Sequence, residues 1–120
     1  MEIQVEFFPT LEGSMTSPDG QVFMLKVKRE DGTELFQGFP HEEISNIMEC
    51  AAMQIDNGRD SKGEKIVSAF DTSSFALAIG SEGQTVLSLT VSDKGHINFV
   101  LPVDMPRQLH SALGKLQVRH

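Results

Sequence analysis

The sequence contains neither tryptophan nor tyrosine, and it has one cysteine among 120 residues. Without those two aromatic residues, a stacking platform for single-stranded nucleic acid would rest on phenylalanine alone. A single cysteine excludes an internal disulfide, which favours a cytoplasmic location. No apolar run approaches the ~20 residues of a membrane helix. The N-terminal residues lack a basic region ahead of the apolar ones, so we predict neither a membrane segment nor a signal peptide.

Basic residues are also scarce, with ten Lys and Arg against seventeen Asp and Glu and a net charge of −7. Residues 1–60 carry twelve acids and four bases, whereas residues 61–120 carry five acids and six bases. An acidic protein repels phosphate backbones, so a nucleic-acid partner is disfavoured. The acidic first half is either a solvated surface or a face that meets a basic partner.

The length suits a single globular domain over residues 1–120. Alternation of apolar and polar residues predicts seven strands. Their sequences are EIQVEFF (2–8), QVFMLKVK (21–28), TELFQGF (33–39), KIVSAF (65–70), SFALAIG (74–80), TVLSLTV (85–91) and HINFVL (96–101). The segment 9–20 is rich in Pro, Gly and Ser and is predicted to be a loop. Asp31-Gly32 is a strong hairpin-turn signal.

Two amphipathic helices are predicted from apolar residues spaced three and four apart. The first carries Ile44, Ile47, Met48, Ala51 and Ile55, and the second carries Met105, Leu109, Ala112, Leu113 and Leu116. We therefore predict an α+β fold, an antiparallel sheet of six or seven strands with both helices packed on one face. The order of elements is similar to the layout of TATA-box-binding protein, a likeness of fold that transfers no function.

The segments around Pro40 and Pro102 resemble each other. In each, a strand, a glycine turn and a second strand lead to the proline and then to a predicted helix. Apolar residues recur seven positions after each proline, at Ile47 and Leu109. Two interpretations stay open: a ββα pseudo-repeat that arose by duplication, or the general pattern of a hairpin followed by a helix.

The strand face opposite the predicted core carries apolar residues among its polar ones. Apolar residues that cluster on an exposed sheet face form a surface for a partner. We therefore predict a partner surface on this face, with the acidic residues of the first helix as a second part. Its residues are Phe8, Val22, Met24, Phe36, Val86, Val100, Glu42, Glu43 and Glu49.

The stretch FPHEEISNIMEC (39–50) gathers residues that resemble a reactive site. A zinc-protease helix needs a second histidine four positions after His41, where Ser45 stands instead. His41 and Cys50 lie nine helical positions apart and so face opposite sides of a helix. We interpret Glu42 and Glu43 as acids in the first helical turn, facing the helix dipole, and Cys50 as a partly buried thiol.

FDTSS (70–74) is similar to the Asp-Thr-Gly motif of aspartic proteases. Ser73 stands where that motif has its glycine, so we interpret Asp71 as a turn residue. His96 and His110 have no neighbour at metal-ligand spacing. We predict no catalytic residue, no cofactor and no metal.

The leading hypothesis is a small acidic binding or regulatory protein that acts through protein–protein contacts. Self-association into a homodimer, through a sheet face or an edge strand, is one form of it. The alternative is a small enzyme or ligand binder with a pocket between sheet and helices. Such a pocket would gather residues from His41, Cys50, Asp71 and His110, which the sequence does not bring together.

Overall fold

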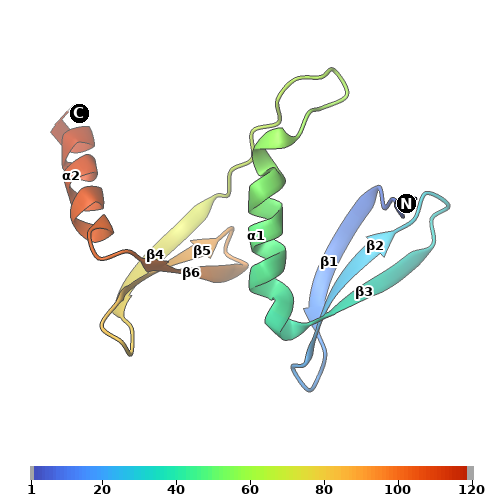
Figure 1. The fold of residues 1–120 in the computed structure, drawn as a ribbon, viewed down its shortest axis with the longest axis horizontal. Helices are drawn as coiled ribbons and strands as arrows, with labels where there is room; N and C mark the ends of the chain where they lie inside the picture. Colours follow the sequence, from blue (N-terminus) through green and yellow to red (C-terminus); the bar gives the residue numbers. More distant parts are fainter. Residues whose placement is uncertain (1, 119–120) are drawn as a thin grey trace. The chain divides into compact units, whose positions relative to one another are not determined.

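The structure is a computed structural model, and it describes residues 2–118. The chain divides into two compact units, unit 1 up to Val67 and unit 2 from Ser68 onward. Each unit is a three-stranded antiparallel meander followed by a helix (Figure 1). The resemblance between the two halves therefore extends from ββα to βββα.

Unit 1 consists of β1 (Thr10–Thr16), β2 (Val22–Lys28), β3 (Glu34–Pro40), the 3-10 turn η1 (His41–Glu43), α1 (Ile44–Gln54) and the 3-10 turn η2 (Ile55–Asn57). Its strands lie in the order β1-β2-β3. Phe23 pairs with Phe39, and Val27 pairs with Leu35, so these four side chains share one face of the sheet. Val27 on the central strand is 5% exposed and marks the centre of this face.

Unit 2 consists of β4 (Thr72–Ile79), β5 (Thr85–Val91), β6 (Gly95–Leu101) and α2 (Met105–Val118). Its strands lie in the order β4-β5-β6 and pair antiparallel. Val27 of unit 1 and Leu101 of unit 2 are the two buried hydrophobic side chains of the described part of the chain. Both units therefore leave much of their apolar surface uncovered.

The tight turns follow from local sequence. At the β2–β3 turn the N–H of Gly32 donates to the carbonyl of Arg29 at 3.0 Å, and φ of Gly32 is 89°. The β4–β5 turn repeats this, with Gly83 donating to Gly80 at 2.9 Å and a φ of 82°. Glycine adopts this left-handed conformation without a steric penalty. The predicted turn at Asp31-Gly32 is confirmed.

The prediction of one sheet with six or seven strands and both helices on one face is wrong, because the structure has two separate three-stranded sheets. The reason lies in residues 58–71, which connect η2 to β4. The predicted strand 65–70 does not form; Lys65 makes an isolated bridge to Arg59, and residues 66–71 join no ladder. No strand therefore continues one sheet into the other.

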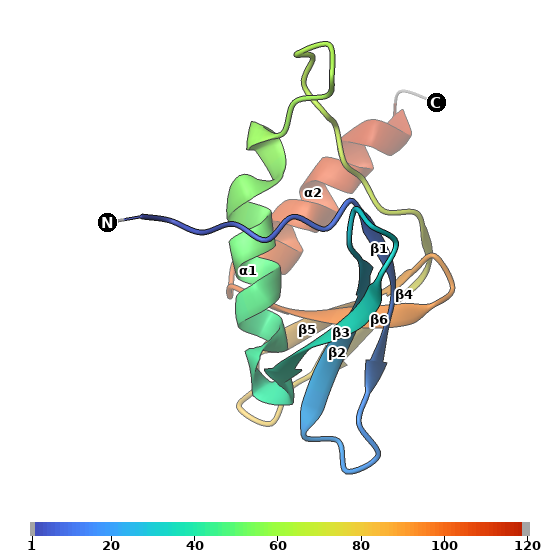
Figure 2. The same cartoon turned by 90° about the vertical axis from the view of Figure 1, so that its right-hand side faces the viewer.

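The first strand lies later in the chain than predicted. Residues 2–8 form no strand and lead as coil into β1 (Figure 2), which occupies much of the predicted loop 9–20. β1 pairs with β2 although it contains Gly13 and Ser14, with an irregularity between Leu11 and Gly13. An extended backbone needs a neighbour for its hydrogen bonds, and alternation alone does not supply one. The segment 2–8 instead contacts the end of β2 through Arg29, whose Nε lies 2.8 Å from Glu6 Oε1.

The remaining predicted elements are confirmed with shifts of one or two residues at their ends. β2, β3, β4, β5 and β6 match five predicted strands, and α1 and α2 match the two predicted helices. α2 begins at Met105, whose N–H donates to the carbonyl of Pro102 at 3.0 Å.

Candidate functional site

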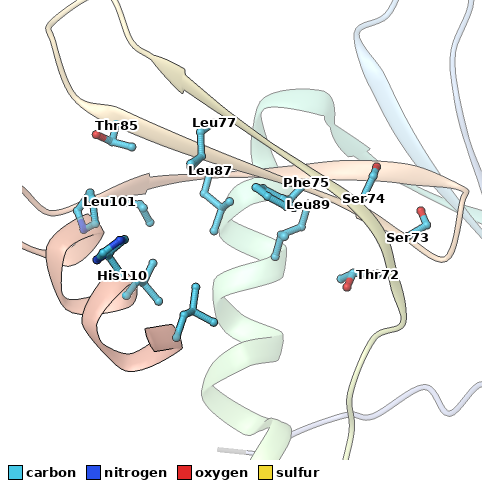
Figure 3. A pocket seen from close by; sticks show the side chains of 13 residues that line it. Thr72, Ser73, Ser74, Phe75, Leu77, Thr85, Leu87, Leu89, Leu101 and His110 are labelled. Carbon is cyan, nitrogen blue, oxygen red and sulfur yellow. The ribbon is translucent and has the colours of Figure 1, made fainter. Parts of the chain in front are cut away.

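An open apolar groove lies in unit 2, between the sheet and α2 (Figure 3). Its volume is about 790 Å³. Below, "the groove" means this space and its principal apolar lining. Strands β4 and β5 form the floor of the groove, and α2 forms its wall. The principal apolar residues of the lining are Phe75, Leu77, Leu87, Leu89, Leu109 and Leu113.

The floor of the groove follows from strand alternation. Phe75 and Leu77 lie two positions apart on β4 and so share one face of the sheet. The ladder pairs Phe75 with Leu89 and Leu77 with Leu87, so the four side chains form one continuous surface. Figure 3 shows Leu87 and Leu89 directed toward the space beside the helix that carries His110.

The groove is poorly covered. Phe75 is 70% exposed, Leu77 62% and Leu113 57%. An apolar sheet face normally packs against a second layer, and α2 covers only part of this one. Unit 2 by itself therefore exposes a contiguous apolar patch.

The polar groups of the groove lie at its margins. Thr72 and Ser73 line it near the start of β4, and His110 lines it from α2. Ser74 belongs to the same segment, and its Oγ donates to Thr90 Oγ1 at 2.9 Å. His110 is the one titratable residue of the lining. The groove is thus suited to hold an apolar surface by burial, with few polar groups to orient it.

The four residues considered for a reactive pocket are divided between the units. His41 lies in η1 and Cys50 in α1, whereas Asp71 precedes β4 and His110 lies on α2. The carbonyl of Asp71 accepts the N–H of Ser92 at 2.7 Å, a backbone role at the start of β4. Between residues 2 and 118, no three His, Cys, Asp or Glu side chains come together in a way that could hold a metal ion.

Cys50 departs from its expected environment. Its interpretation as a partly buried thiol is wrong, since the residue is exposed in α1. The helix buries none of its residues, and its apolar stripe therefore gives Cys50 no cover.

The predicted partner surface is distributed over both units. In unit 1, Val22 and Met24 alternate along β2, and Phe36 pairs with their neighbour Lys26, so all three lie on one face. In unit 2, Val86 pairs directly with Val100, on the sheet face opposite the groove. The other predicted residues lie outside the sheets: Phe8 before β1, Glu42 and Glu43 in η1, and Glu49 in α1.

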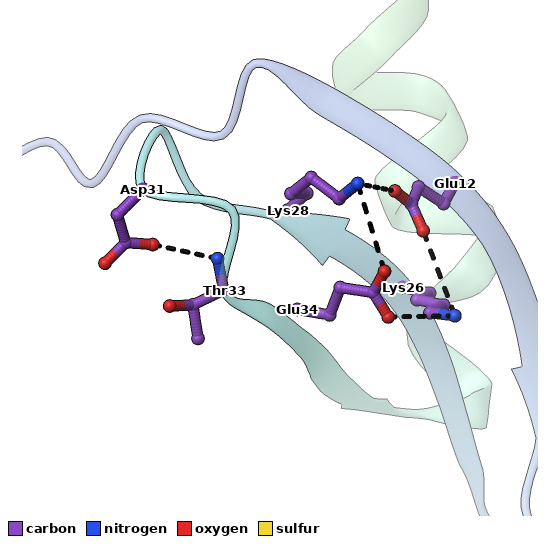
Figure 4. Close-up of polar contacts among 6 residues, drawn as sticks. All are labelled: Glu12, Lys26, Lys28, Asp31, Thr33 and Glu34. Carbon is purple, nitrogen blue, oxygen red and sulfur yellow. Dashed lines mark hydrogen bonds and ion pairs between the residues drawn. The ribbon is translucent and has the colours of Figure 1, made fainter.

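Charged residues share the unit 1 face with the predicted apolar residues. Lys28 Nζ lies 3.0 Å from Glu12 and 3.9 Å from Glu34, and Lys26 Nζ lies 3.8 Å and 3.2 Å from the same two residues (Figure 4). The hydrogen bond with Glu12 and the charge of that carboxylate raise the pKa of Lys28. This ion cluster adapts the face to water, although Phe36 beside it is 50% exposed.

The residues of the groove were not among the predicted site residues. The alternation of β4 and β5 assigns Phe75, Leu77, Leu87 and Leu89 to one face, which sequence reasoning places in the core. Their exposure depends on which element covers that face, and no sequence signal reports it.

No protein-family model matches the chain, and no curated protein and no solved structure matches it significantly. Over the described range 2–118, no helix is long and apolar enough to cross a membrane. Fold and site together define a class: an α+β protein of two βββα units, with an open apolar groove in the second.

Proposed function

We propose that this protein is a small non-enzymatic binding protein that acts through protein–protein contacts, in the first place by self-association into a homodimer. The observation that carries the proposal is the uncovered groove. Six side chains on this sheet face and α2 expose roughly 600 Å², taking about 170–200 Å² for a fully exposed side chain. They are Phe75, Leu77, Ile79, Phe99, Leu109 and Leu113. A standard protein interface buries about 800 Å² per partner, so this face approaches the required size.

The composition of the sheet supports the same proposal. Strands β4, β5 and β6 contain no Asp, Glu, Lys or Arg. The centres of protein interfaces are depleted of charged residues, because burying a charge costs free energy that its contacts must offset.

Light scattering on the full chain tests self-association. We expect a mass of twice 13.2 kDa at high protein concentration. Leu77→Glu puts a charge into the groove and should raise the dissociation constant about a hundredfold or more. Ala78→Glu, at the next position of the same strand but on the opposite sheet face, is the matched control and should change it by less than about threefold. Far-UV circular dichroism checks that both variants fold.

A mass of 13.2 kDa at every concentration would contradict the proposal. Equal weakening by Leu77→Glu and Ala78→Glu would contradict the assignment of the interface to the groove.

A second candidate function is binding of an apolar small molecule. The groove volume falls within the roughly 300–1,000 Å³ of small-molecule sites, and its apolar lining has Thr72, Ser73 and His110 at the margins. A fluorescent fatty acid should then bind the full chain saturably at one molecule per chain. Leu77→Glu should abolish that binding and Ala78→Glu should not. Absence of saturable binding eliminates this candidate.

A further inference from the structure

We propose that Asn57 is a site of spontaneous modification, where the backbone nitrogen of Gly58 attacks the side-chain amide and converts asparagine to aspartate or isoaspartate. The inference goes beyond the proposed function and does not depend on it. Asparagine is among the thermally labile residues of proteins. Both reacting residues belong to unit 1, and the one reagent is water.

The reaction involves no oxidation or reduction. The Gly58 nitrogen gives its proton to hydroxide and forms a bond to Cγ of Asn57. The bond from Cγ to Nδ2 breaks, and Nδ2 takes up a proton and leaves as ammonia, so that a cyclic succinimide remains. Water then adds to one of the two ring carbonyls. Addition at Cγ gives aspartate, and addition at the backbone carbonyl gives isoaspartate, in which the main chain runs through Cγ.

The backbone does not require a glycine at position 58. Gly58 has φ −69° and ψ 142°, an extended conformation that any residue adopts. A Cβ there would lie 3.7 Å from Ile66 Cδ1, which is an ordinary van der Waals contact. By contrast, Gly20 and Gly32 have φ values of 75° and 89°, where glycine avoids a steric penalty. What glycine contributes at position 58 is therefore a backbone nitrogen that no side chain shields.

Asn57 is free to bring its side chain to that nitrogen. It is the last residue of η2, so the chain leaves the helical conformation at the reacting bond. The residue is exposed, and its Nδ2 donates to Gln54 Oε1 at 3.2 Å, at the long end of the usual range. A hydrogen bond in water contributes little net free energy. The side chain can therefore turn toward Gly58 while α1 stays folded.

The same cyclisation is suppressed at the two aspartates that precede glycine, Asp19 and Asp31. A carboxyl group must be protonated before its oxygen can leave as water. Asp19 Oδ1 accepts hydrogen bonds from Ser17 Oγ at 2.6 Å and from the N–H of Gln21 at 3.0 Å, and these bonds lower its pKa. The N–H of Thr33 donates to Asp31 Oδ1 at 2.8 Å and lowers the pKa of that carboxyl. Both groups stay ionised at neutral pH, which leaves the asparagine as the reactive position.

The products change the loop that follows η2. The carbonyl of Gly58 accepts the N–H of Ile66 at 3.1 Å and Nη1 of Arg59 at 2.9 Å. Isoaspartate lengthens the main chain by a methylene group just before this carbonyl, and the shift weakens both hydrogen bonds. Either product also adds one negative charge to a chain whose net charge is −7.

Ageing of the full chain in a warm, mildly alkaline buffer tests the proposal. Asn46 and Asn98 are internal controls, because neither is followed by glycine. Digestion after glutamate separates Asn46 from Asn57, since Glu49 lies between them. Mass spectrometry with electron-based fragmentation then distinguishes isoaspartate from aspartate at each position.

Gly58→Ala is the matched variant, because its added Cβ fits the structure but shields the nitrogen. Far-UV circular dichroism checks that this variant folds. The wild-type chain unfolded in urea shows that the ageing period is long enough for the reaction.

We expect both products at Asn57 of the folded chain, forming at least about tenfold faster than at Asn46 or Asn98, and at least about tenfold more slowly in Gly58→Ala. Isoaspartate identifies the cyclic route, because direct hydrolysis of the side-chain amide gives aspartate alone. Persistence of Asn57 in the folded chain would overturn the inference. Aspartate without isoaspartate, or equal rates in wild type and Gly58→Ala, would overturn it as well.

Discussion

The sheets of the two units have the same strand order but different faces. In unit 1, the face opposite Val27 carries two lysines and two glutamates in one ion cluster. In unit 2, His96 is the one titratable side chain of the three strands, and both sheet faces are uncharged. An antiparallel sheet can expose one polar face to water, as the sheet of unit 1 does. The second face of the unit 2 sheet is polar without being charged, since it carries Ser74, Ser88, Thr90, His96 and Asn98.

The first edge strands of the two units, β1 and β4, also differ in charge. β1 carries Glu12 at an irregularity of its ladder, and charged residues and bulges both discourage pairing with another sheet. β4 is also an edge strand with an irregularity in its ladder, between Thr72 and Ser74, but it is uncharged, and its Phe75 and Ile79 are 70% and 75% exposed. The two edge strands therefore differ in charge and in exposed apolar surface.

The largest expected effect is on the free energy of unfolding. It distinguishes a buried from an exposed position on the groove face of the unit 2 sheet. Leu101→Ala should lower the free energy of unfolding by about 2–5 kcal/mol, because Leu101 is buried and its loss leaves a cavity. Leu77→Ala, the same substitution at a 62% exposed position, should cost less than about 1 kcal/mol in dilute, monomeric protein. Urea titrations followed by far-UV circular dichroism measure both. Equal costs at that dilution would show that Leu77 is already covered within one chain.

A smaller effect compares the turns of the two units. Gly32→Ala and Gly83→Ala should each cost about 1–2 kcal/mol, because alanine resists the left-handed backbone found at both positions. An added Cβ meets no atom within 4 Å at either glycine, so the cost is that of the backbone and should be equal in the two units. Gly→Asn variants should recover part of it, since asparagine tolerates this conformation. If the two Gly→Ala variants lose unequal amounts of unfolding free energy in the same urea titrations, the two turns contribute differently to stability.

The smallest effect concerns the ion cluster of unit 1. Because the pKa of Lys28 is raised, its attraction to Glu12 is fully present below the ordinary value of 10.5 and is lost as pH rises through the raised pKa. At pH values below 10.5, Glu12→Gln should therefore lower the melting temperature slightly. Above pH 10.5, the difference in melting temperature between this variant and wild type should shrink. It should also shrink in 1 M NaCl, where the screening length is about 3 Å. Glu82→Gln, in the exposed β4–β5 turn, is the control, and a salt-independent difference would contradict the electrostatic account.

Local features of this fold could be predicted from sequence. The Gly32 turn, the shared face of Phe23 and Val27, and the start of α2 at Met105 each depend on residues a few positions apart. Pairing between distant segments could not be predicted. Ile3, Val5 and Phe7 alternate like a strand and form none, whereas the Gly13 segment pairs with β2. A ladder forms where a neighbouring backbone is in reach, and alternation does not specify that neighbour.

The same distinction between local and long-range features applies to the groove. The sequence by itself determined that Phe75, Leu77, Leu87 and Leu89 lie on one side of their strands, because the pleat has a period of two. Only the tertiary structure decided that this side is an open surface, because exposure depends on which layer packs on a face, and α2 covers only part of it. The division into two sheets was likewise decided in three dimensions, since residues 58–71 contain a strand-like pattern that finds no ladder.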